Sequence, residues 1–233
     1  MATANNLRFN ASRSRRLANY ARFVEQSRRV DPAGAEGLQE TLRSDPIKMM
    51  GPELAKVGLR TDNLADAYTV YWVEAWQAAH GVAGASSRET AEAVKRQAVN
   101  AILATPEFAQ ATDAQKQEFA DALLVQALLI GAAREQANGD QAKLRQIAAA
   151  VRQGAKASGL DLDAMTLTEQ GFVPAQETGA AEGGPAAPGE EPRALAATKG
   201  PSDGPSYALL AAVGGAGLGA AFLLGKVVGR SRG

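Results

Sequence analysis

The side chains best suited to catalysis or ligand binding are concentrated in one segment, residues 63–81. This segment, NLADAYTVYWVEAWQAAHG, holds both tryptophans, two of the four tyrosines and the only histidine of the chain. Carboxylates, an imidazole and aromatic rings in one place could form a cleft that binds or hydrolyses a glycan or a peptide. The residues of this candidate site or interaction surface are Asp66, Tyr68, Trp72, Glu74, Trp76 and His80.

The spacing of the same residues on a helix favours a packing role. The apolar and aromatic side chains fall on one broad helical face, made of Leu64, Ala65, Tyr68, Tyr71, Trp72, Ala75, Trp76 and Ala79. The opposite arc carries polar side chains that we expect to face solvent or to cap the helix, namely Asp66, Thr69, Gln77 and His80. Aromatic stripes of this kind are usually core, so we assign no catalytic residue.

The composition argues against several other kinds of site. The chain has no cysteine and one histidine, so neither a thiolate site nor a zinc site with histidine ligands is expected. Asp161 and Asp163 resemble the start of a calcium loop, but Thr166 stands where that loop needs glycine. Lys plus Arg equals Asp plus Glu at 25 each, so no overall positive charge attracts nucleic acid. We expect no cofactor, no metal and no enzyme activity.

The elements that position these residues are expected to be helices almost throughout. No run of β-branched residues alternates with polar ones, so we expect no substantial sheet. Apolar spacing and stop signals predict helices over residues 12–29, 35–43, 51–58, 63–80, 86–103, 112–137 and 140–157. Residues 122–133 are apolar on nearly all sides, which is typical of a buried core helix. The predicted fold is all-α, a compact multi-helix domain that is orthogonal or bundle-like.

Several helix ends are predicted from single residues. Ser86 with Glu89, and Thr112 with Gln115, have the spacing of capping boxes. Either Thr61 or Asp62 is expected to cap the helix that begins at residue 63. The pair Asp45-Pro46 is expected to break the chain, and Gly51-Pro52 to open the next short helix.

Composition divides the chain into five parts. We expect residues 1–11 to be a flexible N-terminus and residues 12–174 to form the helical domain. Residues 175–206 are rich in Gly, Pro, Ala and Glu, so we expect a disordered linker. Residues 207–228 are predicted to be a single transmembrane helix, because an uncharged apolar stretch of about 20 residues can cross a bilayer. Residues 229–233 form a basic tail.

Small residues recur in the predicted span at the spacing that allows close packing of membrane helices. They lie in two neighbouring rows, which include Ala208, Ala212, Gly215 and Gly219. An oligomer could therefore form through this helix. A buried hairpin and a cleaved sorting tail are alternatives for this part of the chain. Residues 195–198, Leu-Ala-Ala-Thr, are close to a sorting signal, although Lys199 replaces its glycine.

The charges beside the span predict its orientation. Lys226, Arg230 and Arg232 follow it directly, and the positive-inside rule places them in the cytoplasm. The helical domain would then lie outside the cytoplasm, which requires a signal sequence. The N-terminal residues carry arginines without an apolar stretch after them, which is not the pattern of a signal peptide. The alternative is a tail anchor with the domain in the cytosol.

Three groups of residues carry a resemblance to a protein family. They are Gly58-Leu59, Asn63-Leu-Ala-Asp66-Ala, Tyr71-Trp72-Val and Trp76, then Gln115-Lys-Gln117, and finally Leu167-Thr-Glu-Gln-Gly171-Phe172. Over about residues 12–173 the chain resembles an uncharacterised bacterial family of exported all-helical proteins. The resemblance implies a domain made with a signal peptide, and it implies no particular activity.

These patterns together predict an interaction or scaffolding domain of the bacterial cell envelope that performs no catalysis. Its expected partners are the lipid bilayer and another envelope protein, and it is not expected to bind nucleic acid. One alternative is an envelope hydrolase or a glycan-binding or peptide-binding domain that uses the helix over residues 63–80. Another alternative is a cytosolic, tail-anchored adaptor.

Overall fold

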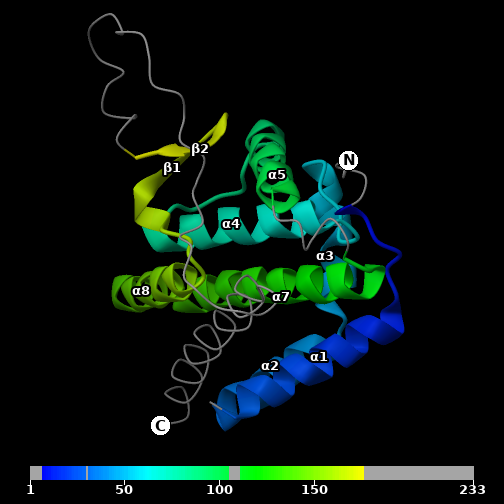
Figure 1. The fold of residues 1–233 in the computed structure, drawn as a ribbon. Helices are drawn as coiled ribbons and strands as arrows, with labels where there is room; N and C mark the ends of the chain where they lie inside the picture. The colour runs from blue at the N-terminus through cyan, green and yellow to red at the C-terminus, as the bar shows by residue number, and fades with distance from the viewer. Residues whose placement is uncertain (1–6, 30, 105–110, 176–233) are drawn as a thin grey trace, which may run out of the picture.

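Helix α4 (Leu64–His80) runs through the middle of the domain, and other elements cover it on several sides (Figure 1). The computed structural model describes residues 7–29, 31–104 and 111–175. Helix α7 (Asp113–Ala137) lies alongside α4 and makes the most extensive contact with it. Helices α5 (Arg88–Leu103) and α8 (Gln141–Ala157) also pack against α4. The described residues contain seven α-helices in one compact arrangement, so the all-α prediction is confirmed.

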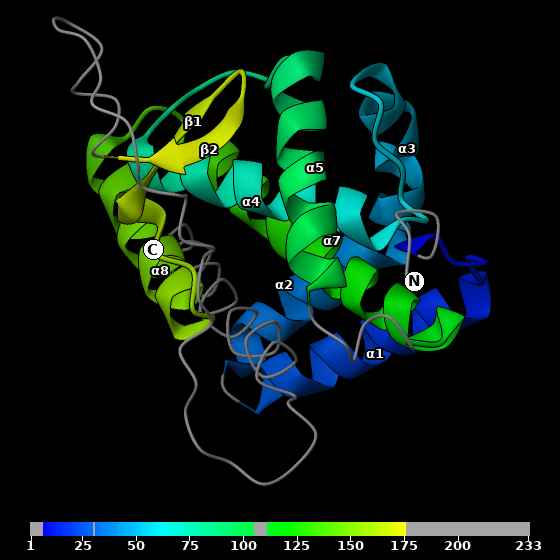
Figure 2. The same cartoon turned by 45° about the horizontal axis from the view of Figure 1, so that its top comes forward.

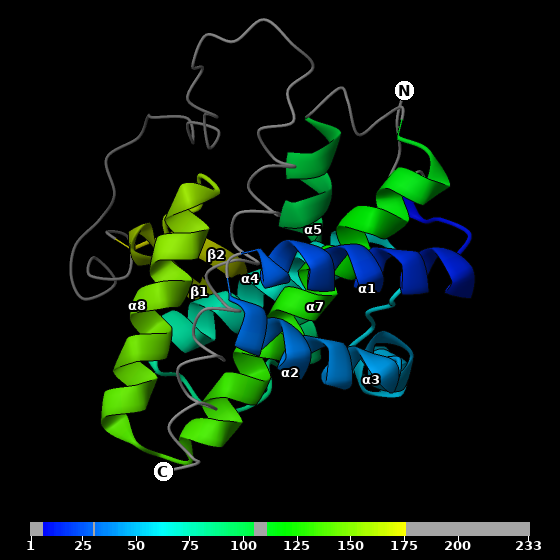
Figure 3. The same cartoon turned by 90° about the horizontal axis from the view of Figure 1, so that it is seen from below.

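The two N-terminal helices form a separate pair beside α7. Helix α1 (Arg13–Arg28) contacts both α2 (Pro32–Arg43) and α7, and the view from below shows α1 and α2 side by side (Figure 3). Helix α3 (Pro46–Lys56) follows α2 after a sharp turn and packs less extensively on α2 and α7. Figure 2 shows α5 standing on α4, next to the only strands in the described residues.

Most helix ends follow the capping residues, with two corrections. The box formed by Thr112 and Gln115 is present at the start of α7, as predicted. The cap of α4 is Asn63 and not Thr61 or Asp62, because the Asn63 side chain accepts hydrogen bonds from the first-turn N–H groups. The cap of α5 is Ser87 instead of Ser86.

The predicted break at Asp45-Pro46 is confirmed, because α2 ends at Arg43 and α3 begins at Pro46. The prediction that Gly51-Pro52 opens a helix over residues 51–58 is wrong, because α3 continues through Pro52 and ends at Lys56. A proline is tolerated at the first helical position, where its missing N–H would have no partner in the helix. Pro52 removes one internal hydrogen bond, but the helix is kept by its buried first turn, where Ile47 reaches the core.

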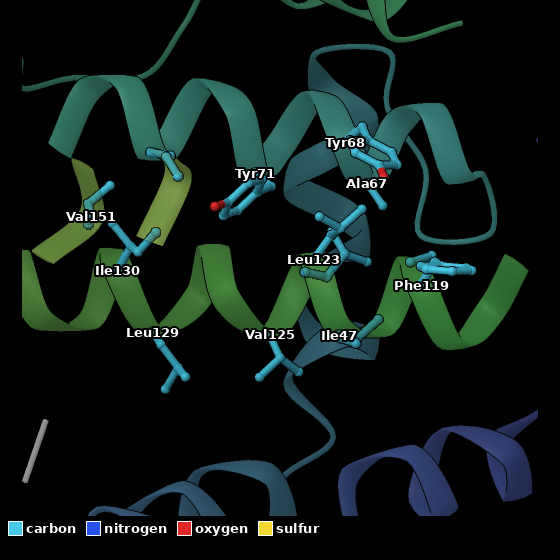
Figure 4. Packing of buried hydrophobic residues seen from close by; sticks show 14 of the residues in the cluster. Ile47, Ala67, Tyr68, Tyr71, Phe119, Leu123, Val125, Leu129, Ile130 and Val151 are labelled. Carbon is cyan, nitrogen blue, oxygen red and sulfur yellow. The ribbon is translucent and has the colours of Figure 1, made fainter. Parts of the chain in front are cut away.

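The core lies between α4 and α7 and is closed by side chains from the other helices. Figure 4 shows Tyr68 and Tyr71 from α4 directed toward Leu123 and Ile130 of α7. The segment 122–133 is confirmed as part of a buried core helix, since most of its large apolar side chains are buried, including Leu123, Leu124, Val125, Leu129 and Ile130. Packing on several sides accounts for the lack of a single apolar stripe on α7.

A small hairpin follows α8 and was not expected from the sequence. After a 3₁₀ turn, η2 (Leu162–Ala164), strand β1 (Met165–Thr168) pairs antiparallel with β2 (Gly171–Pro174). Leu167 lies opposite Phe172 in this register. Two strands alone are marginally stable, so the hairpin depends on the helices beneath it.

The described residues from Leu7 onward belong to the domain, which corrects the expectation of a flexible N-terminus for that part of residues 1–11; residues 1–6 lie outside the described residues. Leu7 is fully buried, and the Phe9 N–H donates to the Asp62 carbonyl oxygen over 3.1 Å. The predicted span over residues 207–228, the basic tail and nearly all of the predicted linker lie outside the described residues. Within those residues, no helix combines the length and the apolar character needed to cross a membrane.

Candidate functional site

The polar face of α4 points into the protein, which corrects the expectation that it faces solvent. Asp66 and Thr69 have no exposed surface, and Gln77 is buried as well. Thr69 Oγ1 donates to the Ala65 carbonyl oxygen within the helix, and Gln77 Nε2 donates to Ser86 Oγ over 3.2 Å. Since α5 and the loop before it cover this face, α4 has hydrogen-bonded polar groups on one side and aromatic packing on the other.

Asp66 forms a buried ion pair with α5. Its Oδ1 lies 2.6 Å from Lys95 Nζ, and its Oδ2 accepts a hydrogen bond from the Arg60 N–H over 2.9 Å. Burial raises the pKa of Asp66, and the contact with Lys95 opposes that change. Both carboxylate oxygens of Asp66 are therefore engaged with groups of the protein itself.

Glu74 is half-buried and pairs with a different helix. Its Oε1 lies 2.6 Å from Arg134 Nη1 on α7. The second guanidinium nitrogen of Arg134 donates to the Val82 carbonyl oxygen, just after the end of α4. This contact joins α4, α7 and the loop that leads to α5.

His80 lies at the exposed end of α4 and has a third set of partners. Its ring stacks on Trp76 with centroids 4.3 Å apart, and its Nδ1 lies 3.0 Å from the Trp76 carbonyl oxygen. Its Nε2 lies 3.7 Å from Asp163 Oδ1, which also accepts a hydrogen bond from Arg152 Nε over 2.8 Å.

The three candidate catalytic side chains therefore do not converge. Asp66 pairs with Lys95, Glu74 with Arg134, and His80 with Trp76 and Asp163. General acid–base catalysis requires such groups to reach one substrate atom or one water molecule. No group of three His, Cys, Asp or Glu side chains that could hold a metal ion occurs in the part of the chain that the structure describes.

The aromatic residues of α4 support the C-terminal hairpin. Trp72 and Trp76 each contact the Phe172 ring edge-on, with centroids 6.5 Å apart, and we name these three residues the aromatic platform. The Trp76 indole N–H donates to the Met165 carbonyl oxygen over 2.9 Å. Tyr68 is buried beneath Trp72 and lies edge-on to it at 5.6 Å. Of the predicted interaction surface, Asp66, Tyr68 and Trp76 are buried, Trp72 and Glu74 are half-buried, and His80 is exposed.

Gln97 is an important residue of this region that the sequence did not reveal. Its side-chain amide binds the backbone of Phe172 on both sides, donating to the carbonyl oxygen over 2.7 Å and accepting from the N–H over 2.9 Å. Gly171 adopts a φ of +97° at the start of β2, and a Cβ there would lie 2.6 Å from Gln97 Oε1. The glycine is the one sequence signal that could have indicated this close approach.

A second polar group, also missed from the sequence, lies where α1, the start of α3 and α7 meet. We name it the Arg16 cluster, and its members are Arg16, Asn19, Tyr20, Asp45, Gln117 and Asp121. Arg16 Nη1 donates to Asp45 Oδ1 over 3.1 Å, and Asn19 Nδ2 donates to Asp121 Oδ2 over 2.8 Å. These residues are far apart in the sequence, and no short motif links them.

Comparison with known proteins places the chain in a family but does not assign an activity. A model described as a family of unknown function (DUF6683) matches residues 2–174. No curated protein and no solved structure matches the chain. The matched region covers all the described elements from α1 to β2.

Proposed function

The chain belongs to this family of unknown function, and we propose that its helical domain binds or scaffolds another protein and performs no catalysis. The observation that carries the proposal is the separation of Asp66, Glu74 and His80, each with its own partner from another part of the domain. Ion pairs that join helices in this way fix the positions of the helices relative to one another. A rigid shape with a distinct surface is what an interaction domain needs.

The hairpin side of the domain is the proposed interaction surface. Trp72 is half-buried beside Phe172, and Glu169 and Gln170 at the hairpin turn are exposed. Tryptophan is enriched among the residues that contribute most to protein interfaces, and a polar rim around such a residue is typical of them. His80 extends this surface at the end of α4.

A membrane tether would present this surface close to a bilayer. The described structure ends at Ala175, directly after β2, and the predicted linker and span follow in the sequence. A coil of about 31 residues has an average reach of about 30 Å. We propose that the domain lies outside the cytoplasm of a bacterial cell, as the basic residues after the span favour. The alternative arrangement is a tail anchor with the domain in the cytosol.

Photo-crosslinking in the native cell tests the interaction. A photoreactive phenylalanine derivative at Gln170 of the full chain should yield a discrete adduct with another envelope protein. The same derivative at Glu40, an exposed position on α2, is the matched control and should yield none. Absence of an adduct from Gln170, or the same adduct from both positions, would contradict the proposed surface.

Two further measurements test the other parts of the proposal. Turnover of an envelope glycan or peptide by the purified full chain, abolished by Glu74→Gln or His80→Asn, would overturn the non-catalytic assignment. A reporter fused after Gly233 should be active in the cytoplasm only. Activity of that reporter outside the cytoplasm alone would refute the exported topology.

A further inference from the structure

The Arg16 cluster holds more negative than positive charge in a buried place. Asp45 and Asp121 provide two carboxylates, and among the described residues Arg16 is the guanidinium that contacts both. The side chains of Arg16 and Asp45 are each 10% exposed and that of Asp121 is 1% exposed. If both acids are ionised, the cluster has one uncompensated negative charge, and a buried charge without a partner is strongly disfavoured.

The two acids have unequal surroundings. Asp45 accepts hydrogen bonds from Arg16 Nη1 over 3.1 Å and from the Tyr20 hydroxyl over 3.2 Å. Asp121 lies 3.7 Å from Arg16 Nε, and its hydrogen-bond donors are the neutral amides of Asn19 and Gln117. The site therefore favours a proton on Asp121 and an ion pair between Asp45 and Arg16. Burial, and to a lesser degree the charge of Asp45, raise the pKa of Asp121 to about 6.

Asp45 is also a strained residue. It has a φ of 52° and a ψ of 60°, in the left-handed region that non-glycine residues rarely adopt, and a proline follows it. It stands at the cap position of α3, yet its side chain makes no capping hydrogen bond. Its carboxylate is bound by Arg16 and Tyr20 of α1 instead. The conformation of the turn between α2 and α3 therefore depends on the cluster.

Most of the other charged groups on the surrounding elements pair away from the Arg16 cluster or are exposed to solvent. On α4, Asp66 pairs with Lys95 of α5, and Glu74 pairs with Arg134 of α7. On α7, Glu118 pairs with Arg22 of α1 at the surface, and Asp113 accepts from the Asn10 N–H. The charged residues of α2 and α3 that are exposed to solvent are Glu36, Glu40, Arg43, Lys48, Glu53 and Lys56. On α1, Arg15 Nε donates to Gln117 Oε1 over 3.0 Å and Arg22 Nη2 donates to Asn19 Oδ1 over 2.7 Å, so these two arginines contact the amides that bind Asp121. Of the residues that the structure describes, Arg16 is the charged group that pairs directly with the Asp121 carboxylate.

We propose that the Arg16 cluster is a proton-dependent lock that joins α1, the turn before α3 and α7 more tightly at mildly acidic pH than at alkaline pH. Protonation of Asp121 removes the uncompensated charge and leaves Asp45 paired with Arg16. Loss of this proton restores repulsion between the two acids across the junction. The turn that contains the strained Asp45 is then held less firmly.

The direction of the pH dependence follows from linkage. The pKa of Asp121 is higher in the folded protein than its ordinary value of 3.8, so the folded state binds the proton more tightly. The resulting stabilisation is complete below pH 3.8 and is lost as the pH rises through about 6. The difference of about two pKa units corresponds to a fall of about 100-fold in the folded-to-unfolded ratio.

Urea unfolding of the full chain at several values between pH 5 and pH 8 tests the lock. Asp121→Asn should remove a fall of about 10-fold in the folded-to-unfolded ratio between pH 5 and pH 8, which is the part of the full change that lies in this range. Glu40→Gln, which removes an exposed carboxylate on α2 that pairs with Arg43 at the surface, is the control and should keep the wild-type profile. An Asp121→Asn profile equal to the wild type, or one that differs in the opposite direction, would overturn the proposal.

A direct titration keeps the proposal testable if Asp121→Asn does not fold. The side-chain carboxyl signal of Asp121, followed by NMR in the wild type, should report a pKa near 6. In Asp45→Asn the repulsion is absent and Arg16 is released, so the Asp121 pKa should fall. A wild-type Asp121 that titrates near 4, or an Asp45→Asn variant in which its pKa rises, would refute the lock. In the wild type, amide exchange in α1 should become faster with rising pH by more than the intrinsic increase. In Asp121→Asn it should follow the intrinsic increase alone.

Discussion

The side-chain amide of Gln97 pairs with both backbone groups of Phe172, at 2.7 Å and 2.9 Å. A side chain on α5 thus occupies the position that a third strand would take beside β2. The outer edge of β2 is covered at this point, which reduces its tendency to pair with another chain. The hairpin is consequently attached to α5 by polar contacts and to α4 by the aromatic platform.

Replacing Gly171 by alanine should loosen the hairpin. Its φ of +97° is unfavourable for alanine, and the new Cβ would lie 2.6 Å from Gln97 Oε1. We expect the free energy of unfolding to fall by about 1–3 kcal/mol, with faster amide exchange in residues 165–175. Gly139→Ala is the control for the backbone effect alone, because φ is +80° there and no atom lies within 4 Å of the added Cβ. Adding Gln97→Ala to Gly171→Ala should recover only the part of the lost stability that is due to the clash. Equal losses of stability in Gly171→Ala and Gly139→Ala would contradict a contribution from the clash.

Replacing Lys95 by methionine should leave the Asp66 carboxylate without its cation. Loss of one partner from a buried ion pair costs about 3 kcal/mol of stability at neutral pH, near the low end because the Lys95 side chain is 30% exposed. The pKa of Asp66 should rise further, so the loss should be smaller at acidic pH. Urea unfolding at pH 5 and pH 8 measures both effects. Arg96→Met, at the next and exposed position, should change stability little at either pH.

Replacing Tyr68 by phenylalanine should stabilise the protein. The Tyr68 hydroxyl is buried and has no hydrogen-bond partner among the residues that the structure describes, which is unfavourable by about 1–3 kcal/mol. Tyr20→Phe is the opposite case, because it removes a hydrogen bond of 3.2 Å to Asp45, and we expect it to destabilise by about 1 kcal/mol. Thermal unfolding of the two variants should therefore shift in opposite directions, and a lower melting temperature for Tyr68→Phe would contradict the assignment.

Replacing Trp76 by phenylalanine should weaken the attachment of β1 to α4 selectively. The ring contacts are partly kept, but the hydrogen bond of 2.9 Å to the Met165 carbonyl oxygen is lost, at a cost of about 1 kcal/mol. Amide exchange in β1 should quicken more than exchange in α5. Trp72→Phe is the matched control, since Trp72 packs on the same Phe172 ring. A larger effect on β1 from Trp72→Phe would show that ring packing, and not the indole N–H, holds this strand.

Local signals in the sequence were sufficient to predict the helices and most of their ends. Thr112 and Gln115 form the expected capping box, and Asn138 closes α7 in a left-handed conformation. Such caps involve residues a few positions apart, so one sequence contains all the information they need. The prediction failed at Gly51-Pro52, where a proline that usually marks the first turn of a helix lies inside α3 instead.

The candidate site could not be predicted because its contacts join distant residues. Dividing α4 into an apolar and a solvent-facing side assumes that one side meets water, but α4 is covered on both. The partner of Asp66 is Lys95 on the following helix, and that of Glu74 is Arg134 on α7. The strands of four residues are too short to show an alternating pattern, so the hairpin over Phe172 had no periodic signal.

The position of the hairpin at the end of the described chain determines how the domain responds to a pulling force. The Ala175 N–H donates to the Ala164 carbonyl oxygen, which closes the open end of the hairpin. Tension applied beyond Ala175 reaches that hydrogen bond first and then the pairs of β2 one after another, a geometry that resists force weakly. The force then acts on Phe172, which is held by the Gln97 amide and by the indole rings of Trp72 and Trp76. The hairpin would therefore extend under low tension and lengthen the chain while α4 and α7 stay packed.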